Sequence, residues 1–223
     1  TPPVLPAGSL CRVRFTLLED RPFLKLAAYF LGIHRGFGLK LMGSPVTVKD
    51  VLVVPTAEDP WPGHADPLDL YEQATGGDTI ALNFASPTTF RRGDKNMPLP
   101  LPRLVFQGLY EKWHYFCPKR PLKGDLLDFV DQYVFPAEFN IHTDIIDYGK
   151  NVLLVGFVGN CTFGMGRAVA RTYPDYSRQL DLLARLAFYT GVGQKTTMGM
   201  GQCLSHIGDG SKSEAGSADI PET

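Results

Sequence analysis

The sequence predicts an α+β fold built from tandem ferredoxin-like (RRM-like) βαββαβ domains, the first of which is incomplete at its N-terminus. In the second half of the chain, β-prone runs and amphipathic stretches follow the order strand, helix, strands, helix, strand. A Pro- and Gly-rich stretch precedes this half, and the elements before it match only the later part of the same unit. The expected ranges are 1–54 for the C-terminal part of the first domain, 55–77 for a linker, 78–206 for the second domain and 207–223 for a disordered tail.

The first half of the chain has the pattern strand, helix, strand. Residues 10–18 alternate charged and apolar side chains, which is typical of a half-buried strand. A short helix is expected over 23–31, after Pro22. The β-branched residues of 45–54 indicate another strand. Residues 55–77 contain four prolines and three glycines, and they are expected to form a surface loop.

The second half begins with an alternating strand over 79–84, followed by a polar, Pro-rich loop over 86–103. Residues 104–116 are expected to be helical because apolar side chains recur at helical spacing. This spacing favours a core role over base stacking for its aromatic residues. The helical spacing is that of Phe106, Leu109, Tyr110 and Trp113, and the aromatic residues are Phe106, Tyr110, Trp113 and Phe116.

The remaining elements complete the unit. Residues 152–161 are strongly β-prone, and 177–189 have a helical apolar face with Ser177 as the expected N-cap. Residues 200–205 are expected to be the final strand. The Gly, Ser and acidic content that follows is typical of disorder.

Composition limits the class of protein. Hydrophobic residues at 44% and charged residues at 20% are ordinary for a globular protein, and no apolar run approaches the roughly 18 residues of a membrane span. A net charge of −1 argues against indiscriminate coating of nucleic acid but leaves room for a local basic surface. The four cysteines and five histidines are scattered, so we expect reduced thiols, no metal site and no cofactor.

The most informative stretch is 191–201, with the sequence GVGQKTTMGMG. Alternating glycines expose backbone N–H groups, and one lysine with two hydroxyls suits a phosphate-rich partner. A Walker A loop is excluded because Gln194 precedes the Lys-Thr pair, and a dinucleotide fingerprint is excluded by Thr196 at its sixth position. The alternative is a helix C-cap at Gly191 followed by a Gly-tolerant strand entry. We favour binding, because the cap leaves the other glycines unexplained.

Three blocks of sequence carry a resemblance to a known family. Residues 183–201, LARLAFYTGVGQKTTMGMG, are similar to the C-terminal glycine-rich signature of the CRISPR-associated repeat-processing endoribonucleases of the RAMP superfamily. The block FASPTTFR at 84–91, with LPLP at 99–102 and the helix ending near Trp113, resembles a second motif of that family. VGFVG at 155–159 resembles its strand before the last helix.

The resemblance implies a function in CRISPR RNA maturation. Such a protein would bind the stem-loop of a CRISPR repeat and cut precursor RNA without a metal ion, by attack of the ribose 2′-OH on the adjacent phosphate. It would stay on the crRNA 3′ stem-loop, join other subunits of an effector complex and work in a prokaryotic cytoplasm, away from membranes. The alternative is a non-catalytic subunit with the same fold that caps the guide RNA.

The expected RNA-binding residues lie in the matched motifs. Basic side chains in one loop are expected to contact phosphate, as are the polar residues between the glycines, whereas the glycines provide backbone shape. Four further basic residues, Lys112, Lys119, Arg120 and Lys123, are mostly expected on a solvated face. The predicted RNA-binding set is Arg91, Arg92, Lys95, Gly191, Gly193, Lys195, Thr196, Thr197, Gly199 and Gly201.

The catalytic residues are not identified by the sequence. The family resemblance implies a histidine in the first helix of the first domain, which this sequence does not contain. The chain opens with Thr1-Pro2-Pro3 rather than methionine, and we expect an N-terminal piece with catalytic residues to be missing. His34, beside Arg35, is a weak candidate, and a loop histidine is the simpler interpretation.

Overall fold

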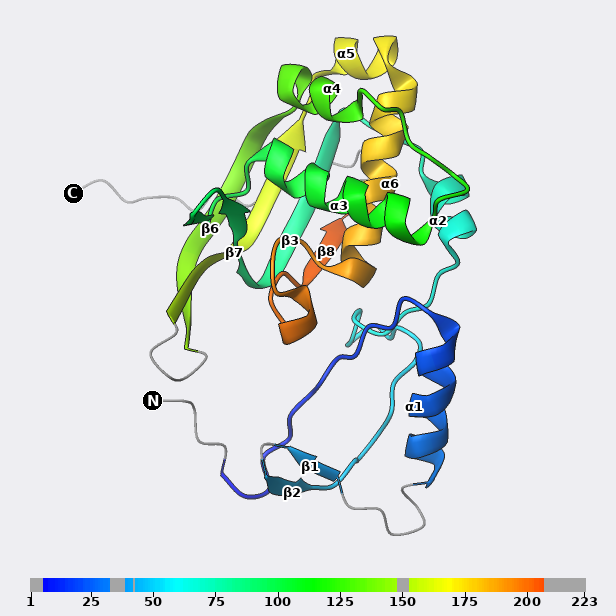
Figure 1. Cartoon of the computed structure of the whole chain (residues 1–223), viewed down its shortest axis with the longest axis vertical. Coiled ribbons are helices and arrows are strands. Elements are labelled where there is room, and N and C mark those ends of the chain that lie inside the picture. Colours follow the sequence, from blue (N-terminus) through cyan, green and yellow to red (C-terminus); the bar gives the residue numbers. More distant parts are fainter. Residues whose placement is uncertain (1–5, 33–38, 42, 148–152, 207–223) are drawn as a thin grey trace, which may run out of the picture.

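The second half of the chain forms a complete βαββαβ unit in the computed structural model, which describes residues 6–32, 39–41, 43–147 and 153–206 (Figure 1). The strand order of its sheet is β6-β7-β3-β8, and every neighbouring pair is antiparallel, which is the ferredoxin-like arrangement. The predicted α+β class is therefore confirmed. The elements are β3 (Thr79–Thr88), α3 (Pro102–Phe116), α4 (Leu126–Tyr133), β6 (Phe135–Asp147), β7 (Leu153–Gly164), α5 (Arg167–Thr172), α6 (Pro174–Thr190) and β8 (Cys203–His206).

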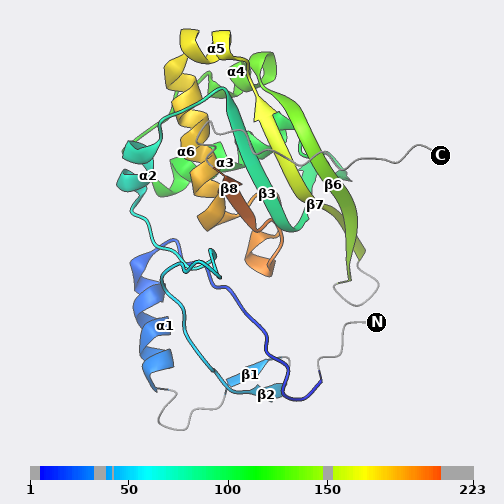
Figure 2. The same ribbon diagram turned by 180° about the vertical axis from the view of Figure 1, so that it is seen from behind.

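The core lies between this sheet and the helices α3 and α6, which cover one of its faces (Figure 1). Figure 2 gives the view from behind. Phe106 of α3 meets Phe163 of β7 edge to face, with ring centroids 5.4 Å apart. Trp113 is fully buried, and its indole N–H donates to the carbonyl of Arg120. The core interpretation of the aromatic helix is confirmed, because burial of these rings supplies much of the apolar area of the unit.

The first half departs from the predicted order of strand, helix and strand. It contains α1 (Asp20–Gly32) and a short hairpin of β1 (Leu39–Leu41) and β2 (Ser44–Val46). The strand predicted over 10–18 is wrong, and the one over 45–54 is present only as β2. A β-prone run becomes a strand only when a neighbour satisfies its backbone N–H and C=O groups, and no described segment pairs with 10–18 or 47–54.

The segment predicted as a linker packs against the second half of the chain. It contains α2 (Pro67–Gln73), which begins after Asp66, whose carboxylate accepts from the Leu68 N–H at 2.7 Å. Leu70 is buried in the core, and Trp61 stacks on Phe188 of α6 with ring centroids 6.1 Å apart. The expectation of a surface loop throughout 55–77 is thus wrong, because its apolar side chains find partners on α6.

Helix α6 begins at Pro174, three residues before the predicted start, so the N-cap assigned to Ser177 is wrong. The fixed φ of proline suits the first helical position. Ser177 is buried instead, where its hydroxyl donates to the Gly77 carbonyl and accepts from the Gly77 N–H, both at 2.7 Å. The serine therefore ties the start of β3 to the helix.

Three further expectations concern the loops and the ends. The predicted loop 86–103 contains a hairpin, β4 (Phe90–Arg92) and β5 (Lys95–Met97). The disordered tail predicted for 207–223 lies outside the described residues. Within the described ranges, no helix has both the length and the apolar composition that crossing a membrane requires.

Candidate nucleic-acid interface

The glycine-rich segment is a tight loop between α6 and β8. Helix α6 ends at Thr190, and Gly191 follows with a φ of 65°. A short 3-10 turn, η2 (Thr196–Met198), forms the tip of the loop. Lys195 directly precedes η2 and has a φ of 56°, a left-handed conformation that is unusual for a residue with a side chain. The loop thus holds a lysine in a fixed, strained backbone position.

Close backbone packing accounts for two of the glycines. A Cβ on Gly201 would overlap the carbonyl oxygen of Val192, and one on Gly193 would lie 2.5 Å from the carbonyl oxygen of Thr89. Gly199 has open space around it but a φ of 88°. The loop geometry therefore gives Gly193, Gly199 and Gly201 a structural role that a C-cap at Gly191 alone does not explain.

The glycine-rich loop lies directly on the Ser-Pro-Thr-Thr segment at 86–89, the irregular end of β3 where its register with β7 shifts. The N–H of Gln194 donates to the Thr89 carbonyl at 3.0 Å, and the N–H of Gly201 donates to the Pro87 carbonyl at 3.1 Å. The Ser86 hydroxyl donates to the Gly199 carbonyl at 2.9 Å. Two sequence motifs that are about a hundred positions apart thus form one unit, which we call the loop-turn unit (residues 86–89 and 191–201).

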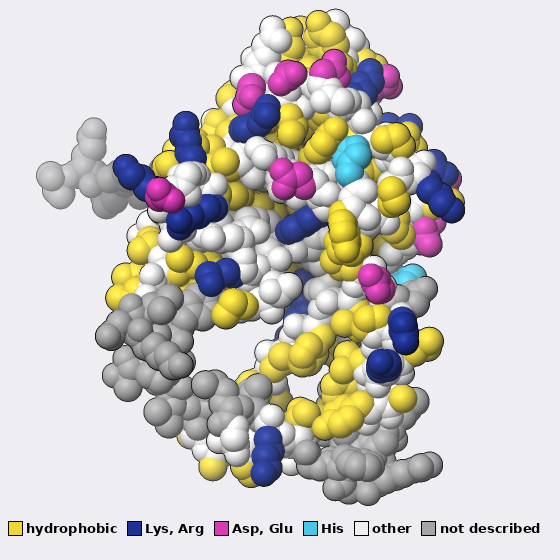
Figure 3. Space-filling model, in the orientation of Figure 1, with side chains coloured by type: hydrophobic (Ala, Val, Ile, Leu, Met, Phe, Trp, Pro, Cys, Tyr) yellow, Lys and Arg dark blue, Asp and Glu magenta, His cyan; other side chains and the backbone are white. Residues whose placement is uncertain are grey.

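A basic hairpin adjoins the loop-turn unit. The side chain of Gln194 donates to Asn96 of β5 at 2.9 Å and so joins the hairpin to the loop. Arg92 is directly across the hairpin from Lys95, and both are exposed. Arg91 is 3.7 Å from the exposed Asp94 carboxylate, a surface pair of small energy. Figure 3 shows Lys and Arg side chains gathered over this hairpin. The structure therefore brings the predicted basic residues next to the glycine-rich loop.

Lys112 of α3 contacts the backbone where α6 ends and the glycine-rich loop begins. Its Nζ donates to the carbonyls of Thr190 and Gly191 at 3.1 and 2.7 Å, so the ammonium group caps the C-terminus of α6. Burial lowers the pKa of Lys112 to about 8. The prediction of a solvated face is wrong for this residue, because the last carbonyls of α6 offer it acceptors.

The burial of Lys112 predicts a pH-dependent stability. Its pKa is about 8 in the folded chain and 10.5 ordinarily, so between these values the unfolded chain binds more protons. The free energy of unfolding is therefore expected to rise with pH across this window, relative to a Lys112→Met variant. Urea unfolding of both proteins at several pH values from 7.5 to 10.5 measures the difference. A difference that does not change with pH would show that Lys112 is not desolvated.

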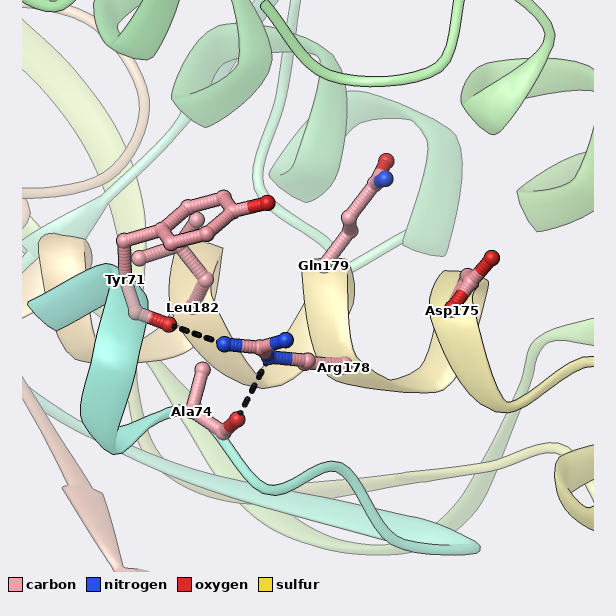
Figure 4. A pocket seen from close by; sticks show the side chains of 6 residues that line it. All are labelled: Tyr71, Ala74, Asp175, Arg178, Gln179 and Leu182. Atoms are coloured by element: carbon pink, nitrogen blue, oxygen red, sulfur yellow. Dashed lines mark hydrogen bonds between the residues drawn. The ribbon is translucent and has the colours of Figure 1, made fainter. Parts of the chain in front are cut away.

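Three further basic residues, Arg120, Lys123 and Arg178, lie against aromatic rings of α2 and α6 and form a second basic cluster. Arg120 and Arg178 each lie about 5 Å from the Tyr71 ring centroid, and Lys123 lies 4.4 Å from that of Tyr176. Arg178 also donates to the carbonyls of Tyr71 and Ala74 at the end of α2 (Figure 4). A pocket of about 170 Å³ opens beside it, lined by Tyr71, Ala74, Asp175, Arg178, Gln179 and Leu182. These cations pack on aromatic rings near the N-terminal end of α6, away from the loop.

The histidine side chains that the structure describes do not gather at one place. Nδ1 of His114 in α3 is hydrogen-bonded to the Tyr110 carbonyl oxygen, and Nε2 accepts from the Leu122 N–H. His114 is therefore a packed residue, as predicted. His64 and His142 are exposed on separate segments, and the weak candidate His34 lies outside the described residues. In the part of the chain that the structure describes, no group of three or more His, Cys, Asp or Glu side chains is arranged to hold a metal ion.

Sequence reasoning missed the polar residues that hold the loop in place. Gln194 and Asn96 bridge the loop and the hairpin, and Gln202 fixes the end of the loop by donating from its N–H to the Ser86 hydroxyl at 2.8 Å. Gln194 stands inside a matched motif, which is a signal for its importance. Asn96 carries no such signal, because a pair 98 positions apart is visible only in the fold.

Comparison with known proteins identifies the same segments. Residues 82–203 match the family described as CRISPR-associated endoribonuclease Cas6. A Streptococcus thermophilus protein described as CRISPR-associated endoribonuclease Cas6 is 24% identical over 135 residues, which are 60% of this chain and 53% of the relative. The chain thus spans about half the length of this curated relative.

Solved structures agree with the sequence match. The product complex of one Cas6 protein is 30% identical, with a TM-score of 0.69, over 83% of this chain and 72% of the other. The product complex of a Thermus thermophilus Cas6 is 27% identical, with a TM-score of 0.72, over 85% of this chain and 73% of the other. The similarity extends over both halves of the chain.

Proposed function

Since the chain belongs to the Cas6 family of CRISPR-associated endoribonucleases, we propose that it binds CRISPR repeat RNA stem-loops and cleaves precursor CRISPR RNA. The product would stay bound through its 3′ stem-loop, and other subunits of a CRISPR effector complex would assemble on it in a prokaryotic cytoplasm. Solved relatives are described as product and substrate-mimic complexes, which supports an RNA substrate for this chain.

The observation that carries the proposal is the continuous surface formed by the loop-turn unit and the basic hairpin. RNA stem-loops are recognised through phosphates, 2′-hydroxyls and shape, and this surface offers cations beside hydroxyls. Arg91, Arg92 and Lys95 are assigned to phosphate contacts on one side of the surface. Lys195, Thr196 and Thr197 supply a cation and two hydroxyls on the other side. Gly191, Gly193, Gly199 and Gly201 set the backbone path between them.

Lys195 provides a test of the loop half of this surface. Replacing Lys195 with asparagine, which tolerates a left-handed backbone, is expected to weaken repeat-RNA binding several-fold. The slope of log affinity against log salt should fall by about 0.7 to 0.9, because one phosphate neutralisation is lost. Lys119→Asn, in the turn after α3, is the matched control. An unchanged affinity and slope for the Lys195 variant would contradict the role assigned to this lysine.

The proposed chemistry is metal-independent transesterification. The ribose 2′-oxygen forms a bond to the adjacent phosphorus while the bond from phosphorus to the 5′-oxygen breaks, which leaves a 2′,3′-cyclic phosphate and a free 5′-OH. A general base takes the 2′-OH proton, and a general acid supplies a proton to the leaving oxygen. We assign neither role to a described residue, and His34 remains the candidate that the sequence offers.

The alternative is a non-catalytic role in capping the guide RNA. The positions of the described histidines support this alternative. His114 is engaged by the backbone of its own helix and the following turn. His64 and His142 are exposed on segments outside the loop-turn unit. The described residues of the surface proposed for RNA thus include cations and hydroxyls that suit binding, and none of these three histidines belongs to that surface.

Incubation of the protein with end-labelled repeat RNA in EDTA tests the proposal. The expected result is a discrete cut at the base of the stem, with a cyclic phosphate on one fragment and a hydroxyl on the other. Tight binding of the hairpin without any cut would support the capping role instead. Failure to prefer the repeat hairpin over an unrelated hairpin of equal length would overturn both.

A further inference from the structure

Arg14 joins the N-terminal part of the chain to the end of the glycine-rich loop. It belongs to the irregular segment 10–18, and its guanidinium donates to the carbonyls of Trp61 and Phe188 at 3.1 and 2.9 Å. Its third hydrogen bond, of 2.6 Å, goes to the side-chain oxygen of Gln202. The guanidinium also lies 4.2 Å from the Phe188 ring centroid and 5.2 Å from that of Trp61. Three of its donors and its planar face are thus all in use.

Gln202 also forms hydrogen bonds, through its backbone, with Ala85 and with Ser86 of the loop-turn unit. Its backbone carbonyl accepts from the Ala85 N–H at 2.9 Å, and its N–H donates to the Ser86 hydroxyl at 2.8 Å. The same hydroxyl donates to the Gly199 carbonyl. A short path of hydrogen bonds therefore runs from Arg14 through Gln202 and Ser86 to Gly199.

Arg12 shows how an arginine of the same segment behaves without such a role. Its side chain is 68% exposed and makes an ion pair of 3.2 Å with Asp59. The Asp59 side chain is only 7% exposed, so the pair ties Arg12 to segment 56–61 and not to the loop-turn unit. The two arginines stand two positions apart, carry the same charge and differ in whether they reach the loop. They form a matched pair for experiment.

We propose that Arg14 is a positioning residue for RNA binding, which makes binding by the loop-turn unit depend on docking of segment 10–18. The proposal rests on the RNA-binding function given above. Arg14 would act through Gln202 rather than on the RNA, since three of its five N–H donors already bond protein acceptors and its face packs on aromatic rings. Docking of the segment would hold Gln202 and Ser86 where they support the tip of the loop.

Arg14→Met and Gln202→Ala, with Arg12→Met as control, test the proposal by two readouts. The first is amide hydrogen exchange of the free protein over residues 199–204, which is expected to speed up in the two test variants alone. The second is the affinity for a repeat hairpin over a range of salt concentrations. We expect affinity to fall at least about fivefold in both test variants, with the salt slope of the wild-type protein.

The outcomes separate the possible roles of Arg14. Loss of affinity with a reduced salt slope would mean a direct phosphate contact and would overturn the proposal. Lower thermal stability with unchanged exchange and affinity would mean a purely structural residue and would also overturn it. If the wild-type protein does not bind repeat RNA, the proposed function fails, and the exchange readout still decides whether Arg14 orders the loop. Gln202→Ala leaves the contacts of Arg14 with Phe188 and Trp61 available, so the test does not depend on one variant folding.

Discussion

Replacing both Arg91 and Arg92 with alanine is expected to weaken repeat-RNA binding by about one to two orders of magnitude near 0.1 M salt. Both side chains are exposed on strand β4 and belong to a hairpin joined to the glycine-rich loop through Asn96 and Gln194. Loss of two phosphate contacts should lower the slope of log affinity against log salt by about 1.4 to 1.8. Fluorescence anisotropy with a labelled hairpin at several salt concentrations measures both quantities.

The control for this variant removes the same charge elsewhere. Arg103→Ala combined with Arg167→Ala changes a partly exposed and an exposed arginine, which pair with Asp131 and Asp78. This control should bind RNA with nearly the affinity and slope of the wild-type protein. Thermal stability of the Arg91 and Arg92 variant should change little, because surface substitutions are usually within about 0.5 kcal/mol. Equal affinities for the variant and its control would show that the hairpin is merely solvated.

Replacing Gly201 with alanine is expected to cost more than about 3 kcal/mol of the free energy of unfolding. Gly201 has a φ of 67°, and an added Cβ would overlap the Val192 carbonyl oxygen. The same short stretch carries the hydrogen bonds from the Val192 N–H to the Gly201 carbonyl and from the Gly201 N–H to the Pro87 carbonyl. The side chain would therefore separate the two ends of the loop and release it from the end of β3 at 86–89.

Two other glycines calibrate the result. Gly199→Ala meets no atom within 4 Å, so only its backbone conformation, with a φ of 88°, should cost energy, about 1 to 2 kcal/mol. Gly108→Ala lies inside α3 with open space around it and should be neutral or stabilising. Urea unfolding ranks the three variants. A Gly201 variant as stable as the Gly108 variant would contradict the close approach of the two backbone segments.

The second half of the chain was predictable because its local patterns agree with its fold. The helix 104–116 and the strand start at 79 follow from spacing that burial confirms, as for Phe106 and Trp113. Strand β6 has no such signal, because nearly all of its residues are exposed and it is defined by its pairing with β7. The first half misleads for a related reason: residues 10–18 have the composition of a strand but no described neighbour to pair with.

The motifs of the candidate site could be predicted from the sequence, but the hydrogen bonds that join its segments could not. The glycines, Lys195 and the basic residues at 91–95 are visible in the sequence, and the fold places them together. Lys112 and Arg14 carry no such signal, since their roles depend on carbonyls at the end of α6 that are distant in sequence. Burial of a cation against a helix terminus is a property of the fold and is not encoded by the neighbours of the residue.

Cross-linking of bound repeat RNA, followed by mass spectrometry of the attached peptides, tests the central claim most directly. The account predicts that cross-links fall in residues 86–97 and 191–201, the loop-turn unit with its hairpin. Arg91→Ala combined with Arg92→Ala should remove those in the hairpin first. Cross-links confined to the second basic cluster, around Tyr71 and Arg178 at the other end of α6, would contradict the account and place the RNA on the opposite end of the domain.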